Sequence, residues 1–407
     1  MKARSVQLAE VLTVERTAAS ETECRTLPYV GLEHIEKNTG HFTEDFRRKP
    51  EMLLATKYRF TPRHVLYGKL RPNLNKTTLP DFDGVCTTEI LPLLPQPQTL
   101  DRGYLYGALL SQRFVKWATN SVSGANLPRL DPERLLEYEI ELPNLSEQQR
   151  IAARLGQADR LRRNHRYALE LTDTFLPAAF LEVFGETGDS FPALTVEELA
   201  AAKPYAIRTG PFGSQLLHSE FIDRGIAVLG IDNAVNNEFA WSQRRFITPE
   251  KYEQLKRYTV FPGDVIITIM GTCGRCAIIP NDIPTAMSTK HLCCITLDQD
   301  RCLPIYLHGA FLFHPFVRRQ QRVATKGSIM DGLNMEIIKS LRIPLPPLRL
   351  QQKFVALVQR VEHLRAVQRE ALRQAEHLFQ TLLHRAFSET DSTNSQGRSS
   401  RMTEEVT

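Results

Sequence analysis

Two stretches of this chain match each other at many positions when they are compared at an offset of 203 residues. Leu130 matches Leu333 in this way. The matches continue without a gap as far as Phe184 and Phe387. They include Ile140 and Ile343, Leu142-Pro143 and Leu345-Pro346, Leu145 and Leu348, Gln148-Gln149 and Gln351-Gln352, and Leu161-Arg162 and Leu364-Arg365. A chance similarity would drift in register over such a length, so we infer a duplicated segment.

Each copy predicts a short strand followed by a long helix. Ser146, with Gln149 three residues later, is typical of a helix N-cap, whereas the second copy has Arg349 at that position. Apolar residues then recur at steps of three and four: Ile151, Leu155, Ala158, Leu161, Ala168, Phe175 and Ala179, and Phe354, Val358, Val361, Leu364, Ala371, Ala375, Leu378 and Leu382. This spacing predicts a coiled coil, although a helix in a bundle core would give a similar pattern. Pro177 predicts a kink or a restart in the first helix.

The length of 407 residues exceeds what one ordinary core holds, so we expect two or three domains. The blocks before each helix contain short β-like runs interrupted by proline and glycine, as in residues 65–72 and 262–269. These patterns predict an α+β domain at 1–122, a helical region at 123–188, a second α+β domain at 189–325 and a second helical region at 326–388. Small polar residues dominate 389–407, which we expect to be a disordered tail.

Composition excludes several classes of protein. Hydrophobic residues make up 42% and charged residues 24%, which are ordinary globular values and exclude a chain disordered throughout. No apolar run approaches about 18 residues, and none follows Lys2 and Arg4, so neither a membrane span nor a secretory signal is expected. Seven cysteines fit reduced thiols and a cytoplasmic location better than a disulfide framework. The net charge of +5 permits a polyanionic partner without requiring one.

Motifs that carry catalysis are missing from the sequence. It contains no Gly-x-Gly-x-x-Gly loop after a strand, no Walker A lysine loop, no His-Glu-x-x-His helix and no Gly-x-Ser-x-Gly turn. The candidate metal group is Cys273, Cys276, Cys293 and Cys294, whose spacing comes near that of a zinc ribbon. Adjacent strand residues face opposite sides, however, so we interpret these cysteines as small apolar residues. We expect no metal and no cofactor here; a cysteine-rich metal-binding protein is the weaker alternative.

Basic and short polar residues at predicted turns are the candidate contacts to nucleic acid. Lys69 and Arg71 would share one face of a strand, which suits a DNA backbone or groove edge. The run from Arg208 to Gln215 could bring backbone N–H groups and hydroxyls against phosphates, although a plain turn would look the same. Basic pairs such as Arg244-Arg245 are expected on solvated faces. The candidates are Lys69, Arg71, Thr87 and Thr88 in the first domain, and Arg208, Thr209, Ser214, Gln215, Arg275 and Lys290 in the second.

The run from Leu142 to Ala152, which reads Leu-Pro-x-Leu-x-Glu-Gln-Gln-Arg-Ile-Ala, resembles the conserved region of type I restriction–modification specificity subunits. The run from Pro344 to Gln352 resembles the second copy of that region. Residues 208–216, 263–266 and 271–275 resemble phrases of the target recognition domains of the same family. The resemblance covers nearly the whole chain, from about residue 5 to residue 388.

The resemblance implies two α+β target recognition domains held apart by two long helices that form an antiparallel coiled coil. Each domain would read one half of a bipartite, asymmetric site in double-stranded DNA, with half-site centres roughly 34 Å apart if the helices act as a ruler. The helical regions would dock two methyltransferase subunits, which carry S-adenosylmethionine and methylate adenine, and restriction subunits would join them. The candidates for partner binding are Gln148, Gln149, Gln351 and Gln352. The chain itself would be a non-catalytic specificity subunit; a DNA-binding adaptor of the same build, uncoupled from methylation, is the alternative.

Overall fold

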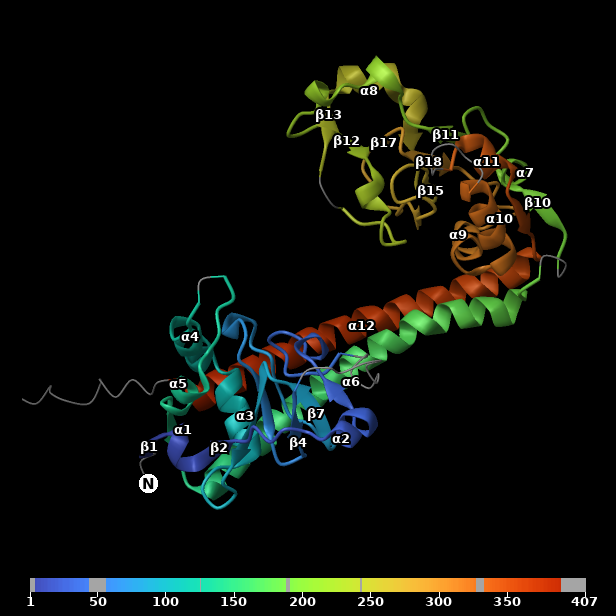
Figure 1. The fold of residues 1–407 in the computed structure, drawn as a ribbon. Helices are drawn as coiled ribbons and strands as arrows, with labels where there is room; N and C mark the ends of the chain where they lie inside the picture. Colours follow the sequence, from blue (N-terminus) through green and yellow to red (C-terminus); the bar gives the residue numbers. More distant parts are fainter. Residues whose placement is uncertain are drawn as a thin grey trace, which may run out of the picture. The chain divides into compact units, whose positions relative to one another are not determined.

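The computed structural model describes residues 4–43, 56–124, 126–187, 191–241, 244–326 and 333–388. The chain forms two compact units, residues 1–166 together with 370–407, and residues 167–369. Each unit contains one mixed α/β domain, which we call domain 1 (residues 4–142) or domain 2 (residues 193–344), and one segment of each of two long helices (Figure 1). The expected tail at 389–407 lies outside the described residues. Within the described ranges, no helix is long and apolar enough to cross a membrane.

Domain 1 is built on small sheets of short strands. One sheet has the order β2 (Leu12–Val14), β8 (Ile90–Pro95), β5 (Val65–Gly68), β6 (Thr77–Thr78), and another the order β3 (Tyr29–Val30), β7 (Gly84–Thr87), β4 (Lys57–Phe60). A third pairs β1 (Arg4–Gln7) with β9 (Glu139–Leu142). The helices are α1 (Leu8–Val11), α2 (Glu21–Thr26), α3 (Arg102–Leu110), α4 (Gln112–Asn120) and α5 (Pro132–Leu136).

Domain 2 repeats this plan. One sheet has the order β11 (Ile207–Thr209), β18 (Leu292–Ile295), β15 (Val265–Thr268), β16 (Cys276–Ile278), and another the order β13 (Phe246–Ile247), β12 (Ile226–Leu229), β17 (Ala286–Ser288), β14 (Thr259–Val260). A third pairs β10 (Ala193–Thr195) with β19 (Arg342–Pro344). The helices are α7 (Val196–Leu199), α8 (Pro249–Leu255), α9 (Pro304–Phe313), α10 (Pro315–Lys326) and α11 (Met335–Ser340).

The duplication therefore extends from the helices into the β domains, where the sequence shows it only loosely. Each domain contains one parallel strand pair, β3 with β7 and β12 with β17. Equivalent backbone hydrogen bonds join the ends of equivalent strands: Gly68 N to Lys76 O and Lys69 N to Glu89 O in domain 1, and Thr268 N to Arg275 O and Ile269 N to His291 O in domain 2. The predicted α+β class and internal two-fold repeat are confirmed.

The long helices are α6 (Leu145–Phe184) and α12 (Leu348–Phe387), both of 40 residues and both beginning at the same point of the repeat. In the second unit Phe180 packs on Phe354, while Asp173 pairs with Arg365, so the two segments run antiparallel. Pro177 lies inside an uninterrupted α6, so the expected restart is wrong. The buried residues Leu176, Ala179 and Phe180 flank this proline, and their packing offsets the hydrogen bond that it removes.

Two local predictions about the helices are also wrong. The cap of α6 is Asn144, whose side chain accepts a 2.9 Å hydrogen bond from Glu147 N, and Ser146 lies inside the helix. Four residues assigned to the apolar seam are more than 40% exposed: Leu161, Phe175, Leu364 and Leu378. The buried positions nearby are Leu176, Phe180, Phe379 and Leu383 instead. Each helix packs against an α/β domain as well as against the other helix, and this second contact moves the buried face.

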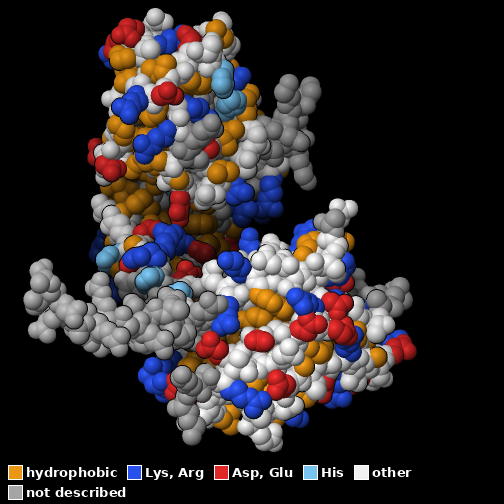
Figure 2. Space-filling view, turned by 90° about the vertical axis from the view of Figure 1, so that its left-hand side faces the viewer, with side chains coloured by type: hydrophobic (Ala, Val, Ile, Leu, Met, Phe, Trp, Pro, Cys, Tyr) orange, Lys and Arg blue, Asp and Glu red, His pale blue; other side chains and the backbone are white. Residues whose placement is uncertain are grey.

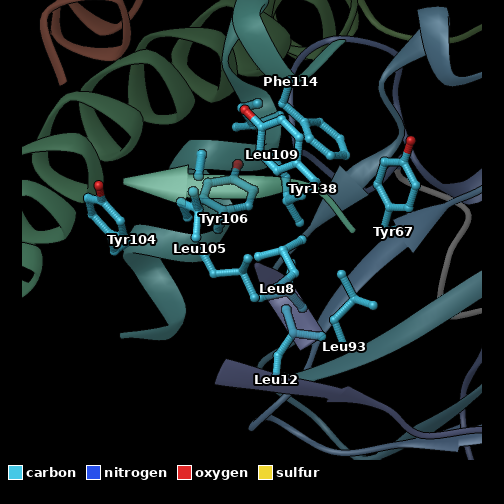
Figure 3. Packing of buried hydrophobic residues seen from close by; sticks show 14 of the residues in the cluster. Leu8, Leu12, Tyr67, Leu93, Tyr104, Leu105, Tyr106, Leu109, Phe114 and Tyr138 are labelled. Carbon is cyan, nitrogen blue, oxygen red and sulfur yellow. The ribbon is translucent and has the colours of Figure 1, made fainter. Parts of the chain in front are cut away.

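The core of domain 1 shows this shared packing. Aromatic and leucine side chains from α1, β2, β5, β8, α3, α4 and the turn before β9 interdigitate in Figure 3: Leu8, Leu12, Tyr67, Leu93, Tyr104, Leu105, Tyr106, Leu109, Phe114 and Tyr138. Leu155 and Ala158 of α6 and Phe379 and Leu383 of α12 belong to the same cluster. In domain 2, Phe180 and Phe184 of α6 and Phe354 of α12 join the corresponding core. Each domain and its two helix segments therefore share one hydrophobic core.

Candidate DNA interface

Of the four glutamines predicted to bind partners, two lie inside the protein. Gln148 is 1% exposed and Gln351 is fully buried, and both make the same contacts in the two copies. Each side-chain NH₂ group donates to two backbone carbonyls, those of Thr99 and Pro143 or those of Arg301 and Pro346. Each side-chain oxygen accepts from a backbone N–H, that of Asp101 or that of Leu303. These two glutamines hold the loop before α3 or α9 on a long helix, while Gln149 and Gln352 are exposed.

Removing either buried glutamine is expected to destabilise its unit. Gln148→Ala or Gln351→Ala leaves three backbone groups without partners in a buried place, and should lower the free energy of unfolding by about 1–3 kcal/mol. The exposed neighbours supply matched controls, because Gln149→Ala and Gln352→Ala should stay within about 0.5 kcal/mol of the parent. Urea unfolding of the four variants measures the difference. Equal losses at buried and exposed positions would contradict the assigned role.

Arg208, a candidate DNA contact, is also buried, at 4% exposure. Its guanidinium pairs with the fully buried Asp264 at the start of β15 and donates to Thr259 O (2.8 Å) and Thr296 Oγ1 (3.0 Å). Asp264 also accepts hydrogen bonds from Thr296 Oγ1 and Phe261 N. The side chain of Arg208 therefore ties β11 to the strands beside it, and its donors point into the protein.

The candidates of domain 1 gather at one edge of the sheet. Lys69 and Arg71 follow β5, while Thr87 ends β7 and Thr88 lies in the turn between β7 and β8. The turns touch, because Lys69 N donates to Glu89 O at 2.9 Å. Arg71 is exposed and has a left-handed backbone (φ 51°), whereas the other three side chains are half-buried. The edge thus offers one free guanidinium beside two hydroxyls and an ammonium group.

In domain 2 the turn between β17 and β18, together with segments after β11, after β12 and before β13, surrounds a hollow of about 640 Å³, and this hollow is the candidate site we favour. Cationic and imidazole side chains on its wall are Arg244, Arg245, Lys290, His218 and His291; Asp223 and Asp232 also line it. The turn that carries Ser214 and Gln215, both exposed, contributes Gly213. Thr209, half-buried in β11, and Arg275, exposed at the end of the turn between β15 and β16, do not line it.

Two glycines make this hollow possible. A Cβ atom on Gly210 would lie 2.1 Å from Ser288 O, so only glycine lets the end of β11 pass this close to β17. A Cβ atom on Gly230 would lie 2.4 Å from Arg245 Nη2 and 2.8 Å from Asp232 Oδ1. Glycine there leaves room for the ion pair between those two residues. The two glycines are visible in the sequence, but the groups that pack against them are known only from the structure.

The hollow is lined by three cationic side chains and two carboxylates, and buried polar atoms around it have no partner among the described residues. Burial, together with the charges of Lys290 and Arg245, lowers the pKa of His291, so its imidazole is neutral at neutral pH. Among the described residues, no partner reaches Arg245 Nε, Asp232 Oδ2 or Thr289 Oγ1, although these atoms are buried. Burying such groups is costly unless something bonds to them. Arg245 Nε needs an acceptor and Asp232 Oδ2 needs a donor, so a ligand that carries both kinds of group, such as a base edge, fits this combination.

Charge elsewhere is mixed. On the face drawn in Figure 2, Lys and Arg side chains alternate with Asp and Glu side chains over both units, and no large region carries one sign only. An anionic partner would therefore be held by local groups rather than by a broad positive field. The sequence alone does not single out Arg244 and Arg245, because such basic pairs are usually found on solvated faces. Only the fold brings them next to Lys290 and His291.

The cysteines of domain 2 are distributed between two cores. Cys276 and Cys293 belong to one hydrophobic cluster and Cys294 to another, as expected for neighbours on a strand. Burial raises the pKa of all three thiols, that of Cys294 to about 11. Cys24 and Cys273 are half-buried, and the other five cysteines are buried. We interpret the buried sulfurs as packing groups.

A thiol-labelling experiment tests this interpretation. At pH 8 the native protein should react rapidly at Cys24 and Cys273 only, and the remaining five thiols should react after unfolding, because buried thiols are protonated and shielded. Absorbance on reaction with an aromatic disulfide counts the thiols, and mass spectrometry locates them. Rapid native labelling of Cys293 or Cys294 would contradict the packing role.

Comparison with known proteins identifies the family. The model of the type I restriction modification DNA specificity domain matches residues 68–171 and 219–376, one match in each half of the repeat. The chain belongs to this family. Among curated members, the EcoDI specificity subunit of Escherichia coli is 30% identical over 155 residues, which are 36% of this chain and 34% of that protein. The MjaVIII specificity subunit of Methanocaldococcus jannaschii is 19% identical over 313 residues, 72% of this chain and 71% of that protein.

The matched part spans about a third of the EcoDI subunit, and likewise 35% of the EcoBI subunit of E. coli. Solved structures of the specificity-subunit family extend the likeness over nearly the whole chain. The type I restriction-modification S subunit from M. genitalium superposes with a TM-score of 0.59 at 14% identity, covering 95% of this chain and 96% of that one. A chain of a type I system whose complex assembly has been described gives 0.58 at 20% identity, covering 95% and 97%. These superpositions show that the fold is shared.

Proposed function

We propose that this chain is the DNA sequence-specificity subunit of a type I restriction–modification complex and reads a bipartite, asymmetric site in double-stranded DNA. One observation carries the proposal: the two domains share a backbone plan but differ in the side chains at equivalent turns. Where domain 1 has Thr88 and Glu89, domain 2 has Lys290 and His291. Two readers of the same build with different surfaces suit two different half-sites.

In this proposal, domains 1 and 2 are the target recognition domains, and α6 and α12 are the frame that keeps them at a set separation. The frame would also dock two methyltransferase subunits and, through them, the restriction subunits. Exposed residues such as Gln149 and Gln352 are available for such contacts. The chain would supply no catalysis. Its candidate interface combines cations, hydroxyls and amides, which are suited to binding DNA, with the carboxylates of Asp223 and Asp232. S-adenosylmethionine would be carried by the methyltransferase subunits.

A genome-wide map of N6-methyladenine, with and without this gene, tests the proposal. We expect one split motif with a non-specific gap to lose its methylation when the gene is deleted. Exchanging domain 2 for that of a relative should change one half of the motif and leave the other half intact. A short, contiguous motif would contradict the two-reader proposal. No change in any motif would contradict coupling to methylation.

A further inference from the structure

An arginine at the same point of the repeat links each long helix to its own domain. Arg162 of α6 and Arg365 of α12 are 203 positions apart, and each has an acidic residue three positions earlier, Asp159 or Glu362. Each arginine bonds to its acidic neighbour and also reaches a loop of the adjacent domain. The shared hydrophobic core and the buried glutamine already hold each domain on its helices, and this arginine adds a contact at another point of the helix. The added contact limits how far the domain can rock about the shared core.

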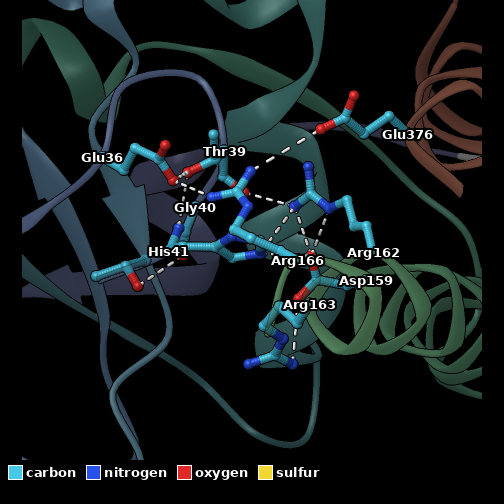
Figure 4. A network of polar contacts seen from close by, with 10 residues as sticks. Glu36, Thr39, Gly40, His41, Asp159, Arg162, Arg163, Arg166 and Glu376 are labelled. Carbon is cyan, nitrogen blue, oxygen red and sulfur yellow. Dashed lines mark hydrogen bonds and ion pairs between the residues drawn. The ribbon is translucent and has the colours of Figure 1, made fainter. Parts of the chain in front are cut away.

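The attachment in the first unit is buried and multiple. Arg162 donates to Thr39 O at 2.5 Å, and His41 Nε2 lies 3.1 Å from Asp159 Oδ1 (Figure 4). The side chains of Arg162, Asp159 and His41 are 4%, 9% and 8% exposed. Arg166, one turn further on, pairs with Glu36 of the same loop.

Aromatic packing and charge complete this first attachment. The guanidinium of Arg162 lies 3.9 Å from the centre of the Phe379 ring. Burial alone would raise the pKa of Asp159, but the hydrogen bond from His41 and the charge of Arg162 lower it, so the carboxylate is charged. Such a network is screened little by salt, because water and ions do not reach it.

The attachment in the second unit is exposed on the side of the domain and is made by one ion pair from Arg365. Arg365 bonds to Thr172 Oγ1 and pairs with Asp173 and Glu362, all on the long helices. Its link to domain 2 is a 3.3 Å ion pair with Glu238, which is 57% exposed. The Arg365 side chain is 12% exposed, but Glu238 faces solvent, so salt screens this ion pair more than the buried network of the first unit. A hollow of about 570 Å³ lies beside the pair, between residues 236–239 and α9 on one side and the long helices on the other.

We propose that Arg162 and Arg365 are positioning residues that set the angle of each recognition domain on its helices, with the first domain held fixed and the second adjustable. The adjustment would act on DNA reading through the direction in which domain 2 presents its turns. Only this effect on DNA reading rests on the proposed function. The attachment itself is a property of the free protein and can be tested without DNA.

Distances between spin labels within each unit test the proposal directly. A Cys24→Ser/Cys273→Ser parent leaves only buried cysteines, and new cysteines at exposed positions would carry the labels. The pair Glu21→Cys and Gln157→Cys joins domain 1 to α6, and the pair Glu253→Cys and Gln359→Cys joins domain 2 to α12. Raising the salt from 50 to 500 mM should broaden the distance distribution of the second pair and leave the first unchanged. Equal behaviour of both pairs would overturn the asymmetry.

Variants separate the attachment from general stability. Glu238→Gln removes only the domain-side partner at an exposed position, and should broaden the second distribution at 50 mM salt as much as 500 mM salt does in the parent. Arg373→Ala, which removes an exposed pair with Glu370 on the same helix, is the control and should change neither distribution. An unchanged distribution in Glu238→Gln would overturn the role of Arg365.

A functional measurement then follows the same variants. In the complex with the methyltransferase subunit, Glu238→Gln should accept targets whose gap is one base pair longer or shorter, with the gap selectivity falling at least threefold and the half-site sequences unchanged. Loss of affinity for all targets without a change in gap selectivity would show a merely structural role. If the parent binds no DNA, the proposed function fails, and the distance measurements still decide the attachment.

Discussion

Replacing Arg208 by alanine is expected to unfold domain 2 rather than to remove a DNA contact. The substitution leaves the carboxylate of Asp264, which is fully buried, without its counter-charge. Breaking a buried ion pair by removing one partner costs about 3–5 kcal/mol, a large part of the stability of a domain this size. Amide hydrogen exchange in β15 and β18, which Arg208 and Asp264 hold together, measures domain 2 by itself and should accelerate strongly.

Two variants make this prediction specific. Arg275→Ala removes an exposed arginine of the same domain and should change stability by less than about 0.5 kcal/mol. Arg208→Met combined with Asp264→Leu replaces both charges with apolar groups and should recover much of the loss, because no buried charge is left alone. A folded Arg208→Ala protein with parental exchange rates and weakened DNA binding would show that the contact role is right and the structural one wrong.

The duplication was the strongest guide to the fold, because a repeat can be recognised in the sequence without knowing which residues are in contact. It predicts the two helices, their length and the number of domains. The apolar seam was less predictable, because Leu161 and Leu364 obey the spacing of a coiled coil but are 45% and 48% exposed. The spacing reports which residues could share a stripe. Only the docking of α3 and α9 decides which stripe is buried.

The site residues divide in the same way. Arg208 and Gln148 stand in motifs that look functional, and their side chains bond inside the protein. A sequence cannot distinguish an arginine that pairs with a buried Asp264 from one that faces solvent, since either can stand beside short polar residues such as Thr209. Lys290 does line the hollow of domain 2. Arg244 and Arg245 also line it, although they lie more than forty positions earlier in the sequence. Strand pairing in the fold brings the two segments together.

Removing two cations from that hollow is expected to weaken DNA binding without changing the sequence that is recognised. Arg244 and Lys290 line it from two segments that are far apart in the sequence. In the described residues, the side chain of Lys290 makes no hydrogen bond or ion pair. The ammonium of Lys290 acts as a point charge suited to a backbone phosphate, and we assign it and the exposed Arg244 to phosphate contacts. Each phosphate contact adds about 0.9 to the slope of log affinity against log salt.

For Arg244→Ala/Lys290→Ala we therefore expect that slope to fall by about two and the affinity at 0.1 M salt to fall by about 60-fold, equally for matched and mismatched duplexes. Arg318→Ala/Arg319→Ala takes the same charge from exposed positions of α10 and should leave the slope within error of the parent. Fluorescence anisotropy over a salt series gives both quantities. If discrimination at one base pair relaxes while the salt slope is kept, the hollow reads a base edge. His291 and Arg245 would then be the residues to substitute next. The neutral imidazole of His291 and the unpaired Nε–H of Arg245 can each bond to a base edge.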